Sequence, residues 1–291
     1  MTSTRVFCLI IFGVAVFASG WRGSYIYDLF DANDIMAPGW PMYATRGEEA
    51  RLFPLFFLVL VLAWFSGGPR EMGFIPKIRG NGVTWLLFIL AYPAVMMVSI
   101  FLGAVVNALS FTTLNFNFYL EKVADNLDWF LPVALVGEVM WRGYLTNQLL
   151  KLRLRPWHIY LITAGLWWLW WVPIWNSAMI KNYYFAEFKI SGIALVVATL
   201  FVFFCWSVFY TEAFRVTRSI WPGVIIYFLM SACGMPEFVK QITSANIVFV
   251  VLLPAALLGV IGFAISRYER TATPVDEVGH QWHTQFKGCF V

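Results

Sequence analysis

Eight long apolar stretches divide this chain of 291 residues, and they leave few folds open to it. A membrane-spanning helix needs about 20 mainly apolar residues. Strands of a membrane barrel would instead alternate in hydrophobicity over about 10 residues. We therefore predict an all-α fold, a polytopic transmembrane helical bundle of about eight spans. The predicted spans are 6–20, 52–67, 83–109, 129–150, 157–175, 190–214, 220–235 and 247–266.

The composition supports a membrane location. Hydrophobic residues make up 60% of the chain and charged residues 12%, whereas soluble domains average about 25% charged residues. The lipid bilayer is therefore the first expected partner. The sequence has no basic run typical of nucleic-acid binding, so we expect no nucleic acid. We assign residues 1–266 to the transmembrane domain, 21–51 to an extracytoplasmic loop and 267–291 to a cytoplasmic tail.

The distribution of basic residues predicts the orientation. Lys and Arg are concentrated at 70–79, 151–155, 215–218 and 267–270, which fall on one side of the predicted bundle. Cytoplasmic loops of membrane proteins carry such an excess. We therefore expect both termini in the cytoplasm. The start of the chain also resembles a signal peptide, with Arg5 before an apolar run that ends at Ala18-Ser19-Gly20; we interpret it as a first transmembrane helix.

Two ionisable side chains, Glu138 and Arg142, lie deep inside a predicted span. A charge at the bilayer centre costs roughly 2.5–3.5 kcal/mol. The spacing of four residues places both side chains on one helix face, where they can neutralise each other. The pair is therefore a candidate functional site, and a purely structural ion pair explains it equally well.

The residues around this pair resemble a known family. Gly-Glu-x-x-Trp-Arg-Gly-Tyr-Leu at 137–145 is similar to the first motif, Glu-Glu-x-x-x-Arg, of the CPBP intramembrane proteases (CAAX-processing and bacteriocin-related enzymes, also called the Abi family). The Trp-rich run 166–173 resembles the second motif, and 210–222 resembles the approach to the third. The resemblance covers roughly 129–231. It implies a CPBP-like helical core and the inner (plasma) membrane of a bacterium.

The chain departs from this family at the catalytic positions. In the family, a first Glu and a His are taken to activate water, and a later His and Asn stabilise the oxyanion. The resemblance places these four positions at Gly137, Trp171, Tyr227 and Ser231. Indole donates a hydrogen bond but accepts none, so Trp171 cannot act as a general base. Tyr227 and Ser231 can still donate hydrogen bonds.

These substitutions predict a catalytically inactive member that acts as a scaffold, an assembly factor or a subunit of a membrane complex, with other membrane proteins as partners. Large aromatic residues would then fill or line the former active-site cavity. One alternative is an active endopeptidase with altered catalytic groups, whose candidate residues are Glu138, Arg142, Tyr227 and Ser231. Another is a lipid- or small-molecule-binding or transport protein, favoured if Trp171 leaves the cavity open. The aromatic residues expected in the cavity are Trp141, Trp168, Trp170, Trp171 and Tyr227.

We expect no metal and no cofactor. One carboxylate without a histidine in the spans offers too few metal ligands, and the four cysteines form no CxxC pair. His158, at the start of a predicted span, is interpreted as an interfacial residue rather than as a displaced base.

Overall fold

The structure, a computed structural model, describes residues 2–32, 41–66, 68–76, 82–107, 124, 127–175, 192–232 and 248–272. Within these ranges all regular structure is helical and no strand occurs. The predicted all-α class is therefore confirmed.

The described segments form eight helical rods. Two of the rods are composite, because a π-helical segment continues directly into an α-helix. A short 3-10 helix, η1 (Pro69–Met72), follows the second rod. The rods are α1 (Thr2–Ala32), α2 (Pro41–Ser66), α3 (Gly82–Val105), α5–η2–α6 (Leu127–Glu138, Val139–Thr146, Asn147–Lys151), α7 (Pro156–Trp175), α9 (Gly192–Thr217), α10 (Trp221–Ala232) and η4–α11 (Val248–Leu252, Leu253–Ala272).

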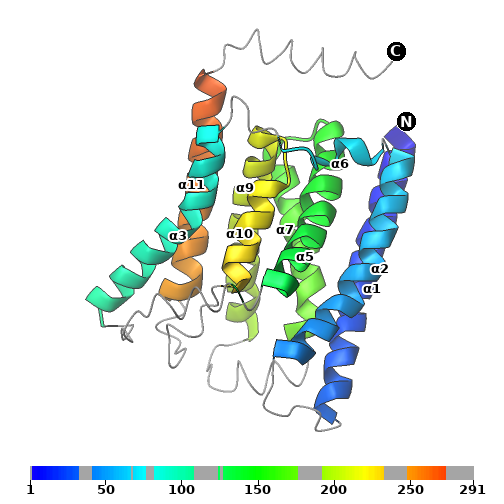
Figure 1. Ribbon diagram of the computed structural model, residues 1–291, viewed down its shortest axis with the longest axis horizontal. Helices are drawn as coiled ribbons and strands as arrows, with labels where there is room; N and C mark the ends of the chain where they lie inside the picture. The colour runs from blue at the N-terminus through cyan, green and yellow to red at the C-terminus, as the bar shows by residue number, and fades with distance from the viewer. Residues whose placement is uncertain are drawn as a thin grey trace.

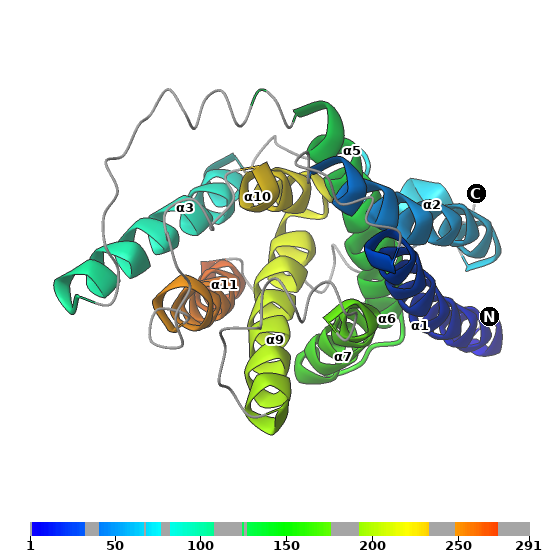
Figure 2. The same cartoon turned by 90° about the horizontal axis from the view of Figure 1, so that it is seen from below.

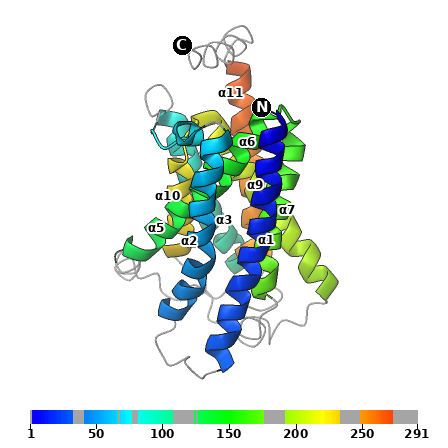
Figure 3. The same cartoon turned by 90° about the vertical axis from the view of Figure 1, so that its right-hand side faces the viewer.

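The rods run largely alongside one another, with α3 tilted away from the others at one end (Figure 1). Helix α9 packs against α7, α10, α11 and α3, while α1 packs against α2 and α7. Figure 2 shows α9 lying between α11 on one side and α7 on the other. The pair α1 and α2 forms one outer face of the bundle (Figure 3). The segment 127–151, which carries the candidate site, packs against α10, α2 and η1.

The outer surface of the bundle is apolar. Trp64 is 75% exposed and Ile193 is 80% exposed, with many other large apolar side chains turned outward. Such a surface suits lipid rather than water. In the described part of the chain, three helices are long and apolar enough to span a membrane by themselves: Ser3–Arg22, Gly82–Val105 and Ile193–Thr217. Shorter apolar helices accompany them, including Arg51–Ser66, Trp221–Met230 and Leu253–Tyr268.

The helices extend further than the apolar runs predicted. Residues 21–32 continue α1, and residues 41–51 belong to α2, although both were expected in an extracytoplasmic loop. The sequence from 21 to 32 contains no proline and only one glycine, Gly23, so nothing stops the helix where its apolar run ends. Residues 267–272, expected in the tail, continue α11. The rest of the predicted loop and tail lies outside the described residues.

Candidate functional site

A π-helix carries the family-like motif. Residues Val139–Thr146 form this segment between α5 and α6, and all eight of its residues are buried. The Thr146 hydroxyl donates a hydrogen bond to the carbonyl of Trp141, 2.9 Å away and five residues back. The wider turn presents successive side chains toward the core. π-Helical turns are rare and occur frequently at functional sites, so this segment is a local departure from the regular helix at the predicted site.

Glu138 and Arg142 form the predicted ion pair. Arg142 Nη1 donates to Glu138 Oε1 over 2.9 Å, and each side chain is 1% exposed. The other oxygen, Glu138 Oε2, has no hydrogen-bond partner among the described residues, and neither do Arg142 Nε and Nη2. The carboxylate of Glu138 therefore neutralises the buried charge of Arg142, while its oxygen Oε2 remains an acceptor without a hydrogen bond among the described residues.

Aromatic rings enclose the guanidinium. The Cζ of Arg142 lies 4.4 Å from the ring centroid of Trp167 and 4.1 Å from that of Tyr210. Tyr227 interacts electrostatically with both Arg142 and Tyr210. Trp141 packs against Trp167, with ring centroids 6.0 Å apart. A cation over aromatic faces gains favourable energy once it is desolvated, so these rings stabilise Arg142 in a dry interior.

The backbone of α10 closes the other side of the carboxylate. A Cβ placed on Gly223 would lie 2.7 Å from Glu138 Cδ and would also overlap Oε2. Only glycine allows α10 to approach the pair this closely. The start of α10 is itself fixed, because Trp221 Nε1 donates to the carbonyl of Phe74 over 2.7 Å.

Trp171 contacts a neighbouring tryptophan and a cation from α2. Its ring packs edge-on against Trp170, with centroids 5.6 Å apart, and the Cζ of Arg51 lies 4.2 Å from its centroid. Trp171 thus contacts a cation from α2, and Trp167, one turn earlier, covers Arg142. Trp168 of α7 faces α9, where its Nε1 donates a hydrogen bond to Thr199 Oγ1 over 3.1 Å.

The remaining predicted positions are described less completely. Gly137 is buried at the end of α5, and no atom of the described residues beyond its own stretch of helix lies within 4 Å of a Cβ placed there. Tyr227 and Ser231 both lie on α10 one turn apart, but the side chain of Ser231 is outside the described residues. The structure thus brings Glu138, Arg142 and Tyr227 together and leaves space beside Gly137.

The described side chains offer limited chemistry at this site. His158 is the one histidine among the described residues, and it stacks on Trp157 at a centroid distance of 3.6 Å. It lies about 20 Å along α7 from Trp171, at about 1.5 Å per residue. In the described ranges, no group of three or more His, Cys, Asp or Glu residues could hold a metal ion. The site contains a carboxylate, a guanidinium and phenol groups.

Two buried charges were missed by the sequence analysis: Arg51 fell at the end of the predicted loop, and Glu212 fell near the end of a predicted span. Arg51 is 0% exposed, and its Cζ lies 3.8 Å from the ring centroid of Trp170. Glu212 is also 0% exposed; it accepts a hydrogen bond from the Tyr160 hydroxyl and pairs with Arg215. The position of both residues at the edges of apolar runs concealed their burial. The clustering of Trp on α7 was the available signal for Arg51, because indole faces bind cations.

Comparison with known proteins supports the resemblance. Residues 122–233 match the family model described as type II CAAX prenyl endopeptidase Rce1-like. No curated protein matches the chain. The matched region contains the π-helix, the Glu138–Arg142 pair, α7 and α10 up to its last residue. The match supports the assignment of this central region to the CPBP family of helical membrane proteins.

Proposed function

We propose that this chain is a non-catalytic member of the CPBP family and acts as a scaffold, an assembly factor or a subunit of a membrane complex. The observation that carries the proposal is the state of Glu138. One carboxylate oxygen is bound by Arg142, and the α10 backbone at Gly223 packs against the carboxylate. A general base must reach the proton that it removes, and a carboxylate enclosed in this way is poorly placed to do so.

The replaced catalytic positions support the same proposal. Trp171 stands at the position of the family's first His and has no basic lone pair to offer. Its ring instead contacts Arg51. An aromatic side chain used to hold a buried cation has a structural role. We infer that the former active site now stabilises the bundle.

The outer surface suits the proposed role. Exposed Phe57, Trp64 and Phe65 lie on α2, and Phe101 lies on α3. In a membrane, large aromatic side chains on an outer face can pack against lipid or against the helices of a partner. We further propose that the termini are cytoplasmic and that the membrane is a bacterial inner membrane.

The size of the protein in mild detergent tests the proposed role. The tagged chain is solubilised from its native membranes and analysed by native electrophoresis, with quantification of every co-migrating subunit. We expect a discrete species well above the 33.3 kDa of the chain, with membrane proteins in fixed stoichiometry. A population that is entirely monomeric across several mild detergents would contradict a scaffold or subunit role.

One observation favours an active intramembrane endopeptidase as the second candidate. Glu138 Oε2 has no partner among the described residues, and the adjacent Gly137 leaves space for another group. A buried acceptor without a partner is costly unless something occupies it. In this reading, Oε2 would accept a proton from water during peptide hydrolysis. Cleavage that depends on Glu138 distinguishes the two candidates.

A further inference from the structure

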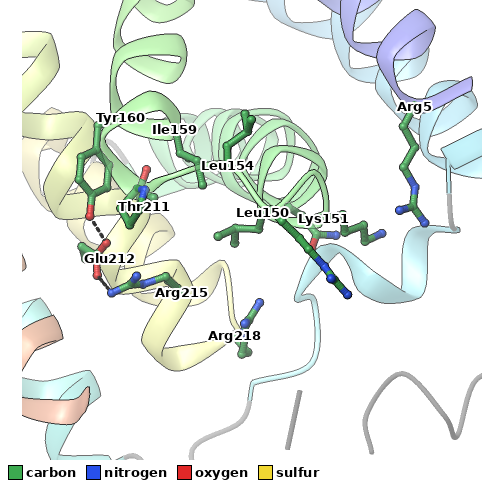
Figure 4. Close-up of a pocket in the computed structure, with 13 residues that line it drawn as sticks. Arg5, Leu150, Lys151, Leu154, Ile159, Tyr160, Thr211, Glu212, Arg215 and Arg218 are labelled. Carbon is green, nitrogen blue, oxygen red and sulfur yellow. Dashed lines mark hydrogen bonds and ion pairs between the residues drawn. The ribbon is translucent and has the colours of Figure 1, made fainter. Parts of the chain in front are cut away.

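A second polar site lies away from the Glu138–Arg142 pair, at the end of the bundle where α1 begins and α9 ends. It is a pocket of about 640 Å³ between α1, α6, α7 and α9. Figure 4 shows Arg5 on one side of it, and Tyr160, Thr211, Glu212 and Arg215 on the other. Neither Glu138 nor Tyr227 lines the pocket.

Among the described residues, the lining of the pocket carries a positive net charge. Its lining includes five basic side chains and one acid, Glu212. Glu212 is paired with Arg215, and Lys151 is paired with Glu71 from η1. Counting Glu71 as well, basic side chains still outnumber acidic ones among these described residues. The basic lining residues are Arg5, Lys151, Arg153, Arg215 and Arg218.

Two of the cations are held in unusual backbone conformations. Arg153 has a φ of 54° and Arg218 a φ of 53°, a region that normally favours glycine. Each follows the end of a helix, α6 and α9 respectively. Burial, reinforced by the charge of Arg215, lowers the pKa of Arg218 to about 10, so this guanidinium is charged at neutral pH in a setting that disfavours the charge. An anion in the pocket would interact favourably with this charge.

A buried hydroxyl also lines the pocket. Thr211 is 1% exposed, and its Oγ1 has no hydrogen-bond partner among the described residues. A hydroxyl can donate to an anionic oxygen. The same pocket has apolar walls from Leu150, Leu154 and Ile159. On the adjacent turn of α7, Leu161 is 49% exposed and Ile162 is 38% exposed.

We propose that this pocket binds a phosphate group presented by an anionic membrane lipid. Arg5, Arg153 and Arg218 supply the positive charge, the Thr211 hydroxyl supplies a hydrogen-bond donor, and the apolar walls accept the start of an acyl chain. Guanidinium groups suit phosphate because their planar donors match two of its oxygens. Basic pockets between helices at a membrane surface bind phosphate headgroups in this way. The apolar walls favour a lipid over free phosphate.

The test is a lipid titration of the full chain in detergent, followed by native mass spectrometry. The probes are phosphatidylglycerol, phosphatidylcholine and inorganic phosphate. We expect phosphatidylglycerol to bind at least about fivefold more tightly than phosphatidylcholine, with the preference falling as salt rises. Equal binding of the two lipids would overturn the proposal. If inorganic phosphate displaces bound phosphatidylglycerol at similar concentrations, the lipid assignment is wrong.

Charge-matched variants localise the effect. Arg218→Gln and Arg5→Gln should each weaken phosphatidylglycerol binding by about fivefold, as expected for one lost basic contact near an anionic lipid. Arg155→Gln is the control, because Arg155 is exposed in the same loop region and does not line the pocket. Equal losses in all three variants would show a general surface effect and contradict a defined site. If Arg218→Gln does not fold, two measurements still test the proposal. They are the loss of phosphatidylglycerol binding in Arg5→Gln and the preference of the wild type for phosphatidylglycerol over phosphatidylcholine.

Discussion

Gly223 on α10 faces the carboxylate of Glu138 on α5 so closely that a Cβ at residue 223 would lie 2.7 Å from Glu138 Cδ. The contact joins two helices that both belong to the matched family region. Because Arg142 holds the same carboxylate at its other oxygen, Glu138 has little freedom to move away. The ion pair and the approach of α10 therefore depend on each other.

This contact predicts that Gly223→Ala destabilises the protein by about 1–3 kcal/mol, the usual range for overpacking a tight core. Thermal unfolding in detergent measures it. Gly137→Ala is the matched control, since a Cβ at that buried position meets no atom within 4 Å in the described part of the chain outside its own helix. The penalty for Gly223→Ala should shrink in a Glu138→Ala background. An equal penalty in both backgrounds would contradict the proposed contact.

Removing the charge of Arg142 alone should reduce the stability of the bundle more than removing the charges of both Arg142 and Glu138. Arg142→Met leaves Glu138 buried without its counter-charge, which we expect to destabilise the bundle by about 3–5 kcal/mol. The double variant Glu138→Gln with Arg142→Met removes both charges and should recover much of that loss. Unfolding midpoints of the single and double variants provide the comparison. The pair would lose its assigned structural role if Arg142→Met were as stable as the wild type.

The cation between Trp170 and Trp171 predicts a third stability effect. Arg51→Lys keeps the positive charge but replaces the planar guanidinium that contacts both rings. We expect a loss of about 1–2 kcal/mol, the value of a desolvated cation–π contact. Trp171→His should show a similar loss, because it removes one of the two rings. Trp168→His, three residues earlier and away from Arg51, tests whether any His on α7 is harmful. A loss equal to that of Trp171→His would argue against the Arg51 contact.

The hydroxyl of Tyr160, which donates to Glu212, predicts a fourth stability effect. Tyr160→Phe removes the hydrogen bond to this fully buried carboxylate, and leaving a buried acceptor short of a partner costs about 1–3 kcal/mol. Tyr25→Phe, on a side chain that is 65% exposed, should be neutral. Chemical denaturation of both variants in the same detergent checks the difference. Two equally stable variants would mean that the Tyr160 hydroxyl does not support Glu212.

The sequence alone predicted the parts of the structure that depend on continuous hydrophobicity and on short spacing. Eight apolar runs gave the eight helical rods, and the four-residue spacing of Glu138 and Arg142 gave their ion pair. Helix ends were less predictable, because 21–32 remains helical without an apolar run.

Contacts between distant segments could not be predicted in the same way. The approach of Gly223 to Glu138 and of Arg51 to Trp171 joins residues far apart in the chain, and it depends on how the helices pack. Burial of Arg51 and Glu212 likewise follows from neighbouring helices rather than from their own surroundings in sequence. No pattern of residues in the sequence predicts the π-helix at 139–146.

We propose that Glu138 does not serve peptide hydrolysis. The direct measurement reconstitutes the wild type and Glu138→Gln in proteoliposomes with fluorogenic and membrane-anchored peptide substrates, and follows the products by mass spectrometry. We predict no cleavage above empty liposomes for either protein, with both correctly folded by their unfolding midpoints. Cleavage by the wild type that disappears in Glu138→Gln, while the Gly137→Ala protein remains active, would contradict the account.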